Sequence, residues 1–275
     1  MSATHIRRLN MGFFGALSAI QRVGWRMAAR IPFGAKRYCC ICESRVQRFL
    51  PYRRGLASVP PLMLQLAVVG SDVEHFECPA CQSHDRERHL LLYLTAANLL
   101  SRMNAARILH FAPETHLQCF IRETGPAEYV LADLFPASPA IQKMDIQAIA
   151  YPADYFDFVL ANHVLEHVQD DAQALREIYR VLNPGGYAIL QTPYASGLTN
   201  TFEDSSIRTE LACLHAYGQE DHRRLFGKDF ERRVADCGLR RATTTHAALL
   251  PHVDVAYMGV NPEEPFLLFQ KPVSR

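Results

Sequence analysis

The 275-residue sequence has no apolar run near the length of about 18 residues that a membrane-spanning helix needs, so we expect no transmembrane segment. The apolar stretch at 11–20 is interrupted by glycines and lacks a small-residue cleavage site, which argues against a secretory signal peptide. Internal repeats and low-complexity segments are also missing. Apolar residues make up 49% and charged residues 21%, a balance typical of a folded globular protein. The length predicts one catalytic-size domain and a smaller module.

Acidic residues are nearly absent from the first 60 residues, which contain eleven Lys and Arg and a single acid, Glu43. The rest of the chain carries a net charge of −9. We expect residues 1–38 to form a basic helical segment. Such a segment can pack on the main domain with its arginines in water, lie on a membrane surface or a polyanion, or act as a targeting peptide. The sequence leaves these three interpretations open.

The cysteine content does not indicate a protein stabilised by disulfide bonds. The eight cysteines, in a chain of this length without a secretory signal, favour a reducing compartment and a cytoplasmic location over a disulfide framework.

Four cysteines form two C-x2-C pairs, Cys39/Cys42 and Cys78/Cys81, separated by 35 residues. Each pair can direct two thiolates at one ion, and two pairs complete a closed tetrahedral site. The pattern predicts a structural zinc. Reduced half-buried cysteines and a redox pair are the alternatives. Cys40 is a further candidate ligand that could replace a neighbour.

We expect residues 39–104 to form a zinc-ribbon-like module with a connecting helix that begins near Ser83. From residue 105 to 275, short apolar runs alternate with helical patterns, which predicts an α/β domain with a doubly wound parallel sheet. The expected strands are 107–111, 129–132, 142–145, 155–161, 187–191 and 265–269. The expected helices are 114–123, 170–182 and 228–237, and residues 183–186 (NPGG) should end the second of these.

One stretch of this domain carries a specific pattern. Residues 153–168 read ADYFDFVLANHVLEHV, and an ALxExxRVLxPGG pattern follows at 174–186. Both resemble the class I S-adenosylmethionine-dependent methyltransferases of the type 11 group, over roughly residues 105–272. The segment LHFAPE at 109–114, behind a CPxC segment, is similar to that of one subgroup. The resemblance implies a Rossmann-like fold and S-adenosylmethionine as cofactor.

The first loop departs from the family pattern of an acid and three glycines. His110, Ala112, Glu114 and His116 stand at the four positions. Glycine allows a close backbone approach to the ligand and a positive φ. We expect Ala112 and Pro113 to shape the turn instead, and Glu114 to bind the cofactor's ammonium group.

The other predicted cofactor contacts are inferred from the positions of residues at strand ends and from the resemblance to the family. Ligands of open α/β sheets bind at the carboxyl ends of the strands, and Asp133 ends the second strand, where an acid can bind ribose hydroxyls. The resemblance implies that Asp145 and Ile146 flank the adenine and that Asn162 lies near the methionine part. The predicted cofactor-binding set is His110, Ala112, Glu114, Asp133, Asp145, Ile146 and Asn162.

Methyl transfer is an in-line displacement that depends on alignment, and a general base helps with hydroxyl or protonated amine acceptors. Two histidines are candidate bases. His163 follows the fourth strand, and His222 lies in a polar loop beside Asp221, which could raise its basicity. Tyr194 and Glu203 are weaker candidates.

The sequence favours a small metabolite or a glycan precursor as the methyl acceptor. The zinc module and the basic N-terminus also suit an RNA substrate, but residues 61–275 are acidic, and residues 162–165 (NHVL) lack the Asn-Pro-Pro-aromatic run of many base methyltransferases. A protein substrate is a further alternative. The last alternative is a methyltransferase-like binding protein without catalysis, which the missing glycines favour and which Asp133, Asp145 and the polar loop around His222 oppose.

Overall fold

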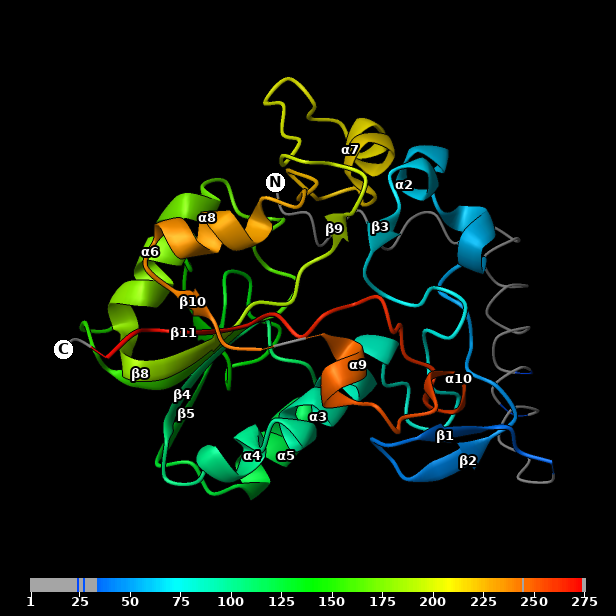
Figure 1. Ribbon diagram of the computed structural model, residues 1–275, viewed down its shortest axis with the longest axis horizontal. Coiled ribbons are helices and arrows are strands. Elements are labelled where there is room, and N and C mark those ends of the chain that lie inside the picture. The colour runs from blue at the N-terminus through cyan, green and yellow to red at the C-terminus, as the bar shows by residue number, and fades with distance from the viewer. Residues whose placement is uncertain (1–23, 25–26, 28–33, 244, 274–275) are drawn as a thin grey trace.

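The computed structural model describes residues 24, 27, 34–243 and 245–273. Its centre is a seven-stranded sheet with the order β10-β11-β8-β7-β4-β5-β6 (Figure 1). The strands are β4 (Arg107–Phe111), β5 (Glu128–Asp133), β6 (Gln142–Lys143), β7 (Phe156–Ala161), β8 (Leu182–Ile189), β10 (Arg240–Arg241) and β11 (Leu268–Gln270). The five strands from β8 to β6 are parallel, and β11 is antiparallel to both of its neighbours. The order reverses between β4 and β7, which confirms the predicted Rossmann-like sheet.

Both faces of the sheet are covered, because successive side chains of a strand point to opposite faces. Leu109 and Val159 pack in one core with helices α6 (Asp171–Val181) and α8 (Phe230–Asp236). Ile108, Phe158 and Leu160 pack in a second core with α3 (Asp85–Ala96), α4 (Leu99–Arg102) and α5 (Leu117–Glu123). Figure 1 shows these two helical layers on either side of the strands.

Several element bounds differ from the predictions. The helix expected over 114–123 begins at Leu117, and the terminal strand lies at Leu268–Gln270 instead of 265–269. Helix α6 ends just before residues 183–186, as predicted. These residues form part of strand β8 instead of a loop, because a register irregularity in the β7–β8 pairing accommodates them. Asn183 anchors the irregularity by donating from Nδ2 to Oδ1 of Asp157 at 2.7 Å.

The N-terminal module begins with the hairpin of β1 (Arg37–Cys39) and β2 (Ser44–Val46). The basic segment predicted at 1–38 lies almost entirely outside the described residues, and its last two residues belong to β1. After the hairpin follow η2 (Gly55–Ser58), α2 (Pro61–Gln65) and β3 (Val68–Val69), which pairs with β9 (Tyr194–Ala195). In the described part of the chain, no helix is long and apolar enough to cross a membrane.

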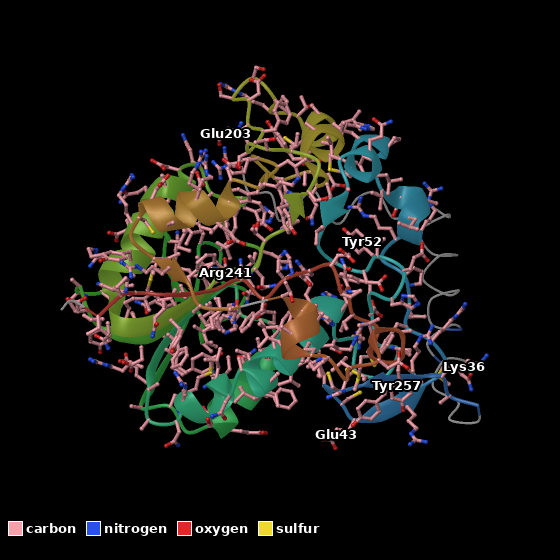
Figure 2. The ribbon with its side chains drawn as sticks, in the orientation of Figure 1. Lys36, Glu43, Tyr52, Glu203, Arg241 and Tyr257 are labelled. Carbon is pink, nitrogen blue, oxygen red and sulfur yellow. The ribbon has the colours of Figure 1, made fainter. Side chains whose placement is uncertain are left out.

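The module shares its core with the sheet. Cys39, Val46 and Phe49 lie in the same buried cluster as Leu94 of α3 and Ile108 of β4. Two short C-terminal helices, α9 (His246–Leu249) and α10 (Val255–Met258), return to this region. Tyr257 of α10 lies beside the hairpin (Figure 2), and its ring stacks on Tyr38 with centroids 5.9 Å apart. The division at residue 104 remains a prediction, and the two parts pack as neighbours.

Arg88 of α3 is fully buried at the junction of three segments. Its guanidinium donates to five backbone carbonyls, and its plane lies over the ring of Phe49, 3.8 Å from the centroid. The carbonyls belong to His75, Phe76, Ser83, Met258 and Gly259. The side chain therefore ties the module and the C-terminal helices to α3.

Asp85, the first residue of α3, is a buried carboxyl group with one unsatisfied oxygen. Its Oδ2 accepts a hydrogen bond from the backbone N–H of Asp72, and its Oδ1 has no partner among the described residues. Burial, reinforced by Glu264, raises the pKa of Asp85 to about 7, and Arg86 and Arg88 oppose the shift.

We expect Asp85→Asn to stabilise the protein at alkaline pH. A raised folded-state pKa means that this group stabilises the folded chain fully below its ordinary pKa of 3.8, and that the contribution is lost as pH rises through about 7. Asparagine stays neutral, so the variant should exceed the wild type by on the order of 2 kcal/mol at about pH 8, with a smaller difference at about pH 5. Urea unfolding at both pH values measures this. The exposed Asp236→Asn is the control, and an Asp85→Asn effect independent of pH would contradict the prediction.

Candidate active site

Three predicted cofactor residues are joined by hydrogen bonds at the carboxyl ends of β4 and β7. His110 is fully buried; its Nδ1 lies 2.8 Å from the hydroxyl of Tyr129 and its Nε2 2.8 Å from Oε2 of Glu114. Nδ2 of Asn162 donates to Oε1 of Glu114 at 3.2 Å. Burial by itself raises the pKa of Glu114, but the hydrogen bonds from His110 and Asn162 outweigh it and hold this pKa below its ordinary value. Glu114 is therefore a carboxylate, held at the first loop by two partners.

Ala112 adopts the backbone conformation for which glycine is usually needed. Its φ is +46°, in the left-handed region, and its N–H donates to the carbonyl of Ala132 at 2.9 Å. An alanine in this region costs about 1–2 kcal/mol, which the hydrogen bonds around the loop offset. The turn thus exists without the family's glycines, so the missing glycines do not by themselves remove the cofactor loop.

The other predicted cofactor residues lie at the ends of the neighbouring strands. Asp133 ends β5, is partly exposed, and accepts a hydrogen bond from the N–H of Phe135 at 2.8 Å. Asp145 follows β6 and accepts from the N–H of Gln147 at 2.8 Å. Ile146 is 4% exposed and packs in the core under this edge. The structure therefore brings the predicted set to one edge of the sheet.

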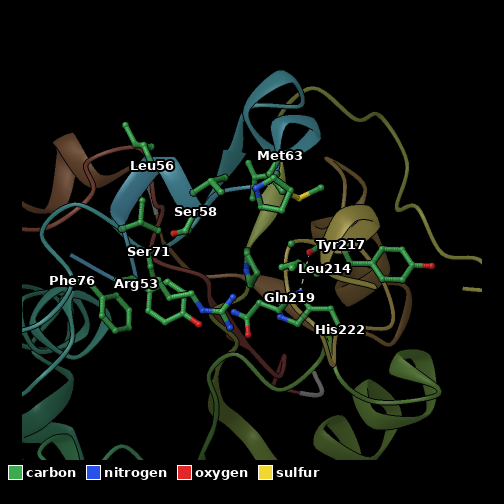
Figure 3. A pocket seen from close by; sticks show the side chains of 18 of the residues that line it. Arg53, Leu56, Ser58, Met63, Ser71, Phe76, Leu214, Tyr217, Gln219 and His222 are labelled. Carbon is green, nitrogen blue, oxygen red and sulfur yellow. Dashed lines mark hydrogen bonds between the residues drawn. The ribbon is translucent and has the colours of Figure 1, made fainter. Parts of the chain in front are cut away.

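A cavity of about 550 Å³ lies between the N-terminal module and α7 (Glu210–Tyr217) with the loop that follows it. Figure 3 shows Arg53, Leu56 and Phe76 on the module's side and Leu214, Tyr217 and His222 on the other. His163 and His222 both line it. The long loop between the two cysteine pairs forms one wall of the cavity, and the sequence analysis did not predict this role. The unusual spacing of 35 residues was the one feature of the sequence that could have indicated it.

His163 lines this cavity and has one ring nitrogen without a hydrogen-bond partner among the described residues. It follows β7 with φ +53°, and its N–H donates to the carbonyl of Gln191 at 2.7 Å. Nδ1 lies 3.4 Å from Oε1 of Glu166, and the buried Nε2 has no partner in the described chain. Oε2 of Glu166 accepts from the hydroxyl of Thr192 at 3.0 Å. Burial alone raises the pKa of Glu166, but His163, together with His222 and His167, lowers it to about 2.

His222 is 3% exposed, and its Nδ1 lies 3.1 Å from the carbonyl of Tyr217. Its Nε2 is buried without a partner among the described residues. Asp221 acts to raise the pKa of His222, as expected, but burial has the larger effect and lowers this pKa overall. Oδ2 of Asp221 lies 3.4 Å from Nδ1 of His167. Both predicted histidines therefore line the cavity. Glu166, which the sequence reasoning did not single out, is buried beside them, 3.4 Å from Nδ1 of His163.

The two weaker candidates have other surroundings. Tyr194 belongs to β9 and pairs with β3. Oε2 of Glu203 accepts from Nε of the buried Arg224 at 3.0 Å, which makes it part of an ion pair. Glu203 lies at the outer edge of the molecule in Figure 2.

The four predicted metal ligands form one cluster. The Sγ atoms of Cys39, Cys42, Cys78 and Cys81 all lie within 4.8 Å of one another. The Cys39–Cys81 distance is 3.8 Å and the Cys42–Cys78 distance is 3.9 Å. Cys40 is directed away and donates from Sγ to the carbonyl of Arg88 at 3.6 Å.

His116, the last of the four first-loop positions, connects this cluster to the sheet. Its Nε2 donates to the carbonyl of Cys81 at 2.9 Å, and its Nδ1 lies 3.0 Å from Oε1 of Glu87. The first loop after β4 is therefore fixed to the cysteine cluster through one side chain.

Comparison with known proteins assigns the fold to a family. The family model described as a methyltransferase domain matches residues 83–242, more than half of the chain. The chain belongs to the methyltransferase domain family. This membership confirms the prediction of a methyltransferase at the level of the family.

Similar proteins have low identity to this methyltransferase domain. An S-adenosylmethionine-dependent methyltransferase from Mesorhizobium loti has 17% identity and a TM-score of 0.43, over 64% of this chain and 94% of that chain. The Burkholderia thailandensis 1,6-didemethyltoxoflavin-N1-methyltransferase, solved with S-adenosylhomocysteine and 1,6-didemethyltoxoflavin, has 15% identity and a TM-score of 0.43, over 66% and 78%. A Dictyostelium discoideum protein named "Probable polyketide synthase 10" is 31% identical over 70 residues, and the match spans 22% of this chain and only 3% of that protein.

Proposed function

We propose that this protein is an S-adenosylmethionine-dependent methyltransferase that methylates a small metabolite or a glycan precursor. The observation that carries the proposal is the cavity of about 550 Å³ beside the carboxyl end of β7, with His163 in its wall. Pockets for small molecules have volumes of about 300–1,000 Å³. The cavity thus suits a small acceptor, held between the module and α7.

The residues at the strand ends fit the cofactor. Asp133 would bind the ribose hydroxyls, and Asp145 and Ile146 would flank the adenine. Ala112, with its positive φ, and the carboxylate of Glu114 would hold the methionine part, and Asn162 and His110 would keep Glu114 in place. When bound, the cofactor supplies an electrophilic methyl group on a sulfonium.

His163 is the residue we propose as general base. Nδ1 faces the carboxylate of Glu166, so it carries the proton, and Nε2 keeps its lone pair. Nε2 can therefore accept the proton that a hydroxyl or ammonium acceptor loses during methyl transfer. Glu166, fixed by Thr192, positions the ring.

We further propose that the four-cysteine cluster holds a structural zinc ion. Four thiolates around one point are the donor set of closed structural zinc sites. Ser83 supports two of the ligands, because its hydroxyl oxygen lies 3.4 Å from Sγ of Cys39 and 3.1 Å from Sγ of Cys81. The ion would fix the module that forms one wall of the cavity.

Thermal unfolding with S-adenosylmethionine tests the cofactor assignment. At a hundred times Kd, ligand binding adds about 2.7 kcal/mol to the unfolding free energy, which raises the melting temperature of a domain of this size by roughly 5–10 °C. S-adenosylhomocysteine should give a similar shift. No shift with either ligand at millimolar concentration would refute the proposed cofactor and favour a binding protein. The Asp133→Ala variant is the matched control and should shift less.

We expect His163→Asn to lower kcat by about 10²–10⁴-fold for the acceptor that a screen identifies. Asparagine tolerates the left-handed backbone at this position but cannot act as a base. The thermal shift with S-adenosylmethionine should stay unchanged, which separates a chemical role from misfolding. His215→Ala, an exposed substitution on α7, serves as the control. An unchanged kcat in His163→Asn would exclude His163 as the base.

A further inference from the structure

A second group of possible metal ligands lies beside the cavity, away from the cysteines. One carboxylate oxygen of Glu166 and one ring nitrogen each of His167 and His222 lie within 4.8 Å of one another. Glu166 and His222 are 1% and 3% exposed, respectively. Oε1 of Glu166 and Nε2 of His222 are both buried polar atoms without a hydrogen-bond partner in the described chain.

The hydrogen bonds of the two histidines fix where their lone pairs are. A backbone carbonyl only accepts, so Nδ1 of His222 must donate to Tyr217 at 3.1 Å, which leaves Nε2 with the lone pair. Nδ1 of His167 lies 3.3 Å from the carbonyl of Asp221, and the same reasoning leaves its Nε2 with the lone pair. Histidines that bind metals usually donate their other N–H to a carbonyl or carboxylate, as both do here.

Glu166 also has one side-chain oxygen that a metal ion could use. Oε2 accepts a hydrogen bond from the hydroxyl of Thr192. Oε1 forms no hydrogen bond with a described residue, and Nδ1 of His163 lies 3.4 Å from it. The three ligand atoms lie within 4.8 Å of one another on two buried residues and one partly exposed residue, and a cation among them would satisfy the carboxylate oxygen and the ring nitrogens together. Their number and type match the two-histidine, one-carboxylate sets that hold catalytic zinc and iron with an open coordination position.

We propose that Glu166, His167 and His222 bind a divalent transition-metal ion distinct from the ion of the cysteine cluster. Metal–ligand bonds of about 2.0–2.2 Å place tetrahedral ligand atoms about 3.4 Å apart, so the three atoms, now within 4.8 Å of one another, would move closer together on binding. Because His222 lines the cavity, the ion lies at the cavity wall and its open position is available to an oxygen of the acceptor. This makes His222 a ligand and leaves His163 as the base. The metal site stands on its own geometry, and only its role toward the acceptor rests on the proposed function.

Cobalt(II) uptake by the zinc-loaded protein tests the site. The protein is incubated with Co²⁺, separated by gel filtration, and analysed for both metals. We expect about one Co²⁺ per chain with the zinc content unchanged, and no thiolate-to-cobalt charge-transfer absorption. Glu166→Gln, which keeps the bond to Thr192, and His222→Ala should each raise the Kd for Co²⁺ at least about tenfold. His163→Asn, which removes a neighbouring histidine that is not a ligand, should bind Co²⁺ as the wild type does.

The outcomes separate this inference from the proposed function. The metal site is overturned if the wild type takes up no Co²⁺ beyond its zinc, or if Glu166→Gln and His222→Ala, with melting temperatures near that of the wild type, bind Co²⁺ unchanged. A thermal shift with S-adenosylmethionine in a protein that binds no Co²⁺ would reject the metal site and support the methyltransferase assignment. Co²⁺ binding without such a shift would support the metal site and reject the cofactor assignment.

Discussion

Replacing Cys78 with serine is expected to abolish zinc binding and to destabilise the N-terminal module strongly. Binding of structural zinc contributes about 10–16 kcal/mol in small zinc-finger peptides, and the loss in this protein should be several kcal/mol, because the shared core with α3 remains. Metal analysis of the purified wild type, after dialysis against a weak chelator that strips loosely held ions, should find about one tightly held zinc per chain, and the variant treated in the same way should have lost it.

Cys40→Ser is the matched control for this experiment. Cys40 lies between two proposed ligands in the sequence, but its Sγ donates to the carbonyl of Arg88, a bond that a serine hydroxyl can replace. Zinc content and melting temperature should therefore stay close to the wild-type values. Retention of zinc by Cys78→Ser, or its loss from Cys40→Ser alone, would contradict the four-cysteine assignment.

Arg88→Met should lower the free energy of unfolding by about 3–5 kcal/mol. Methionine fills much of the same volume but leaves five buried carbonyls without the donor that now serves them. Each buried acceptor left unsatisfied costs about 1–3 kcal/mol before relaxation and water entry reduce the total. Urea unfolding measures the loss. The exposed Arg232→Met on α8 is the control and should change stability little.

Arg88→Lys keeps the interpretation testable if Arg88→Met does not fold. A lysine keeps the positive charge but offers one ammonium group in place of a planar fork, so it can serve only some of the five carbonyls. Its loss of stability should lie between those of the wild type and Arg88→Met. Equal stability of Arg88→Lys and the wild type would show that the charge, and not the set of hydrogen bonds, matters at this position.

The periodicity of the sequence was sufficient for the sheet and its helices. Leu109 and Val159 alternate with Ile108 and Phe158 along β4 and β7, and this alternation separates the two cores that α6 and α3 cover. Ends of elements were predicted less well. Helix α5 starts three residues late and β8 starts before the Asn-Pro-Gly-Gly segment, because a pairing irregularity against β7 is decided by the neighbouring strand.

Part of the candidate site was also accessible from the sequence. His163 and His222 were chosen because each follows a strand or lies in a polar loop, and both line one cavity. Glu166 was not chosen, although it stands within the same motif, because nothing in a linear motif shows which carboxylate turns inward. The positive φ of Ala112 was equally hidden, since the residue type argues against it.

Local periodicity and spacing were enough to predict a parallel α/β sheet, the two cysteine pairs and the strand ends where polar residues gather, and the motif at 153–186 supplied the resemblance to methyltransferases. Tertiary packing decided which segments contact these elements. Packing placed the 35-residue loop between the cysteine pairs against α7 to form a cavity, and it brought His167 and His222, 55 residues apart, next to the carboxylate of Glu166. Such contacts join distant segments, and their positions depend on the shared core as a whole.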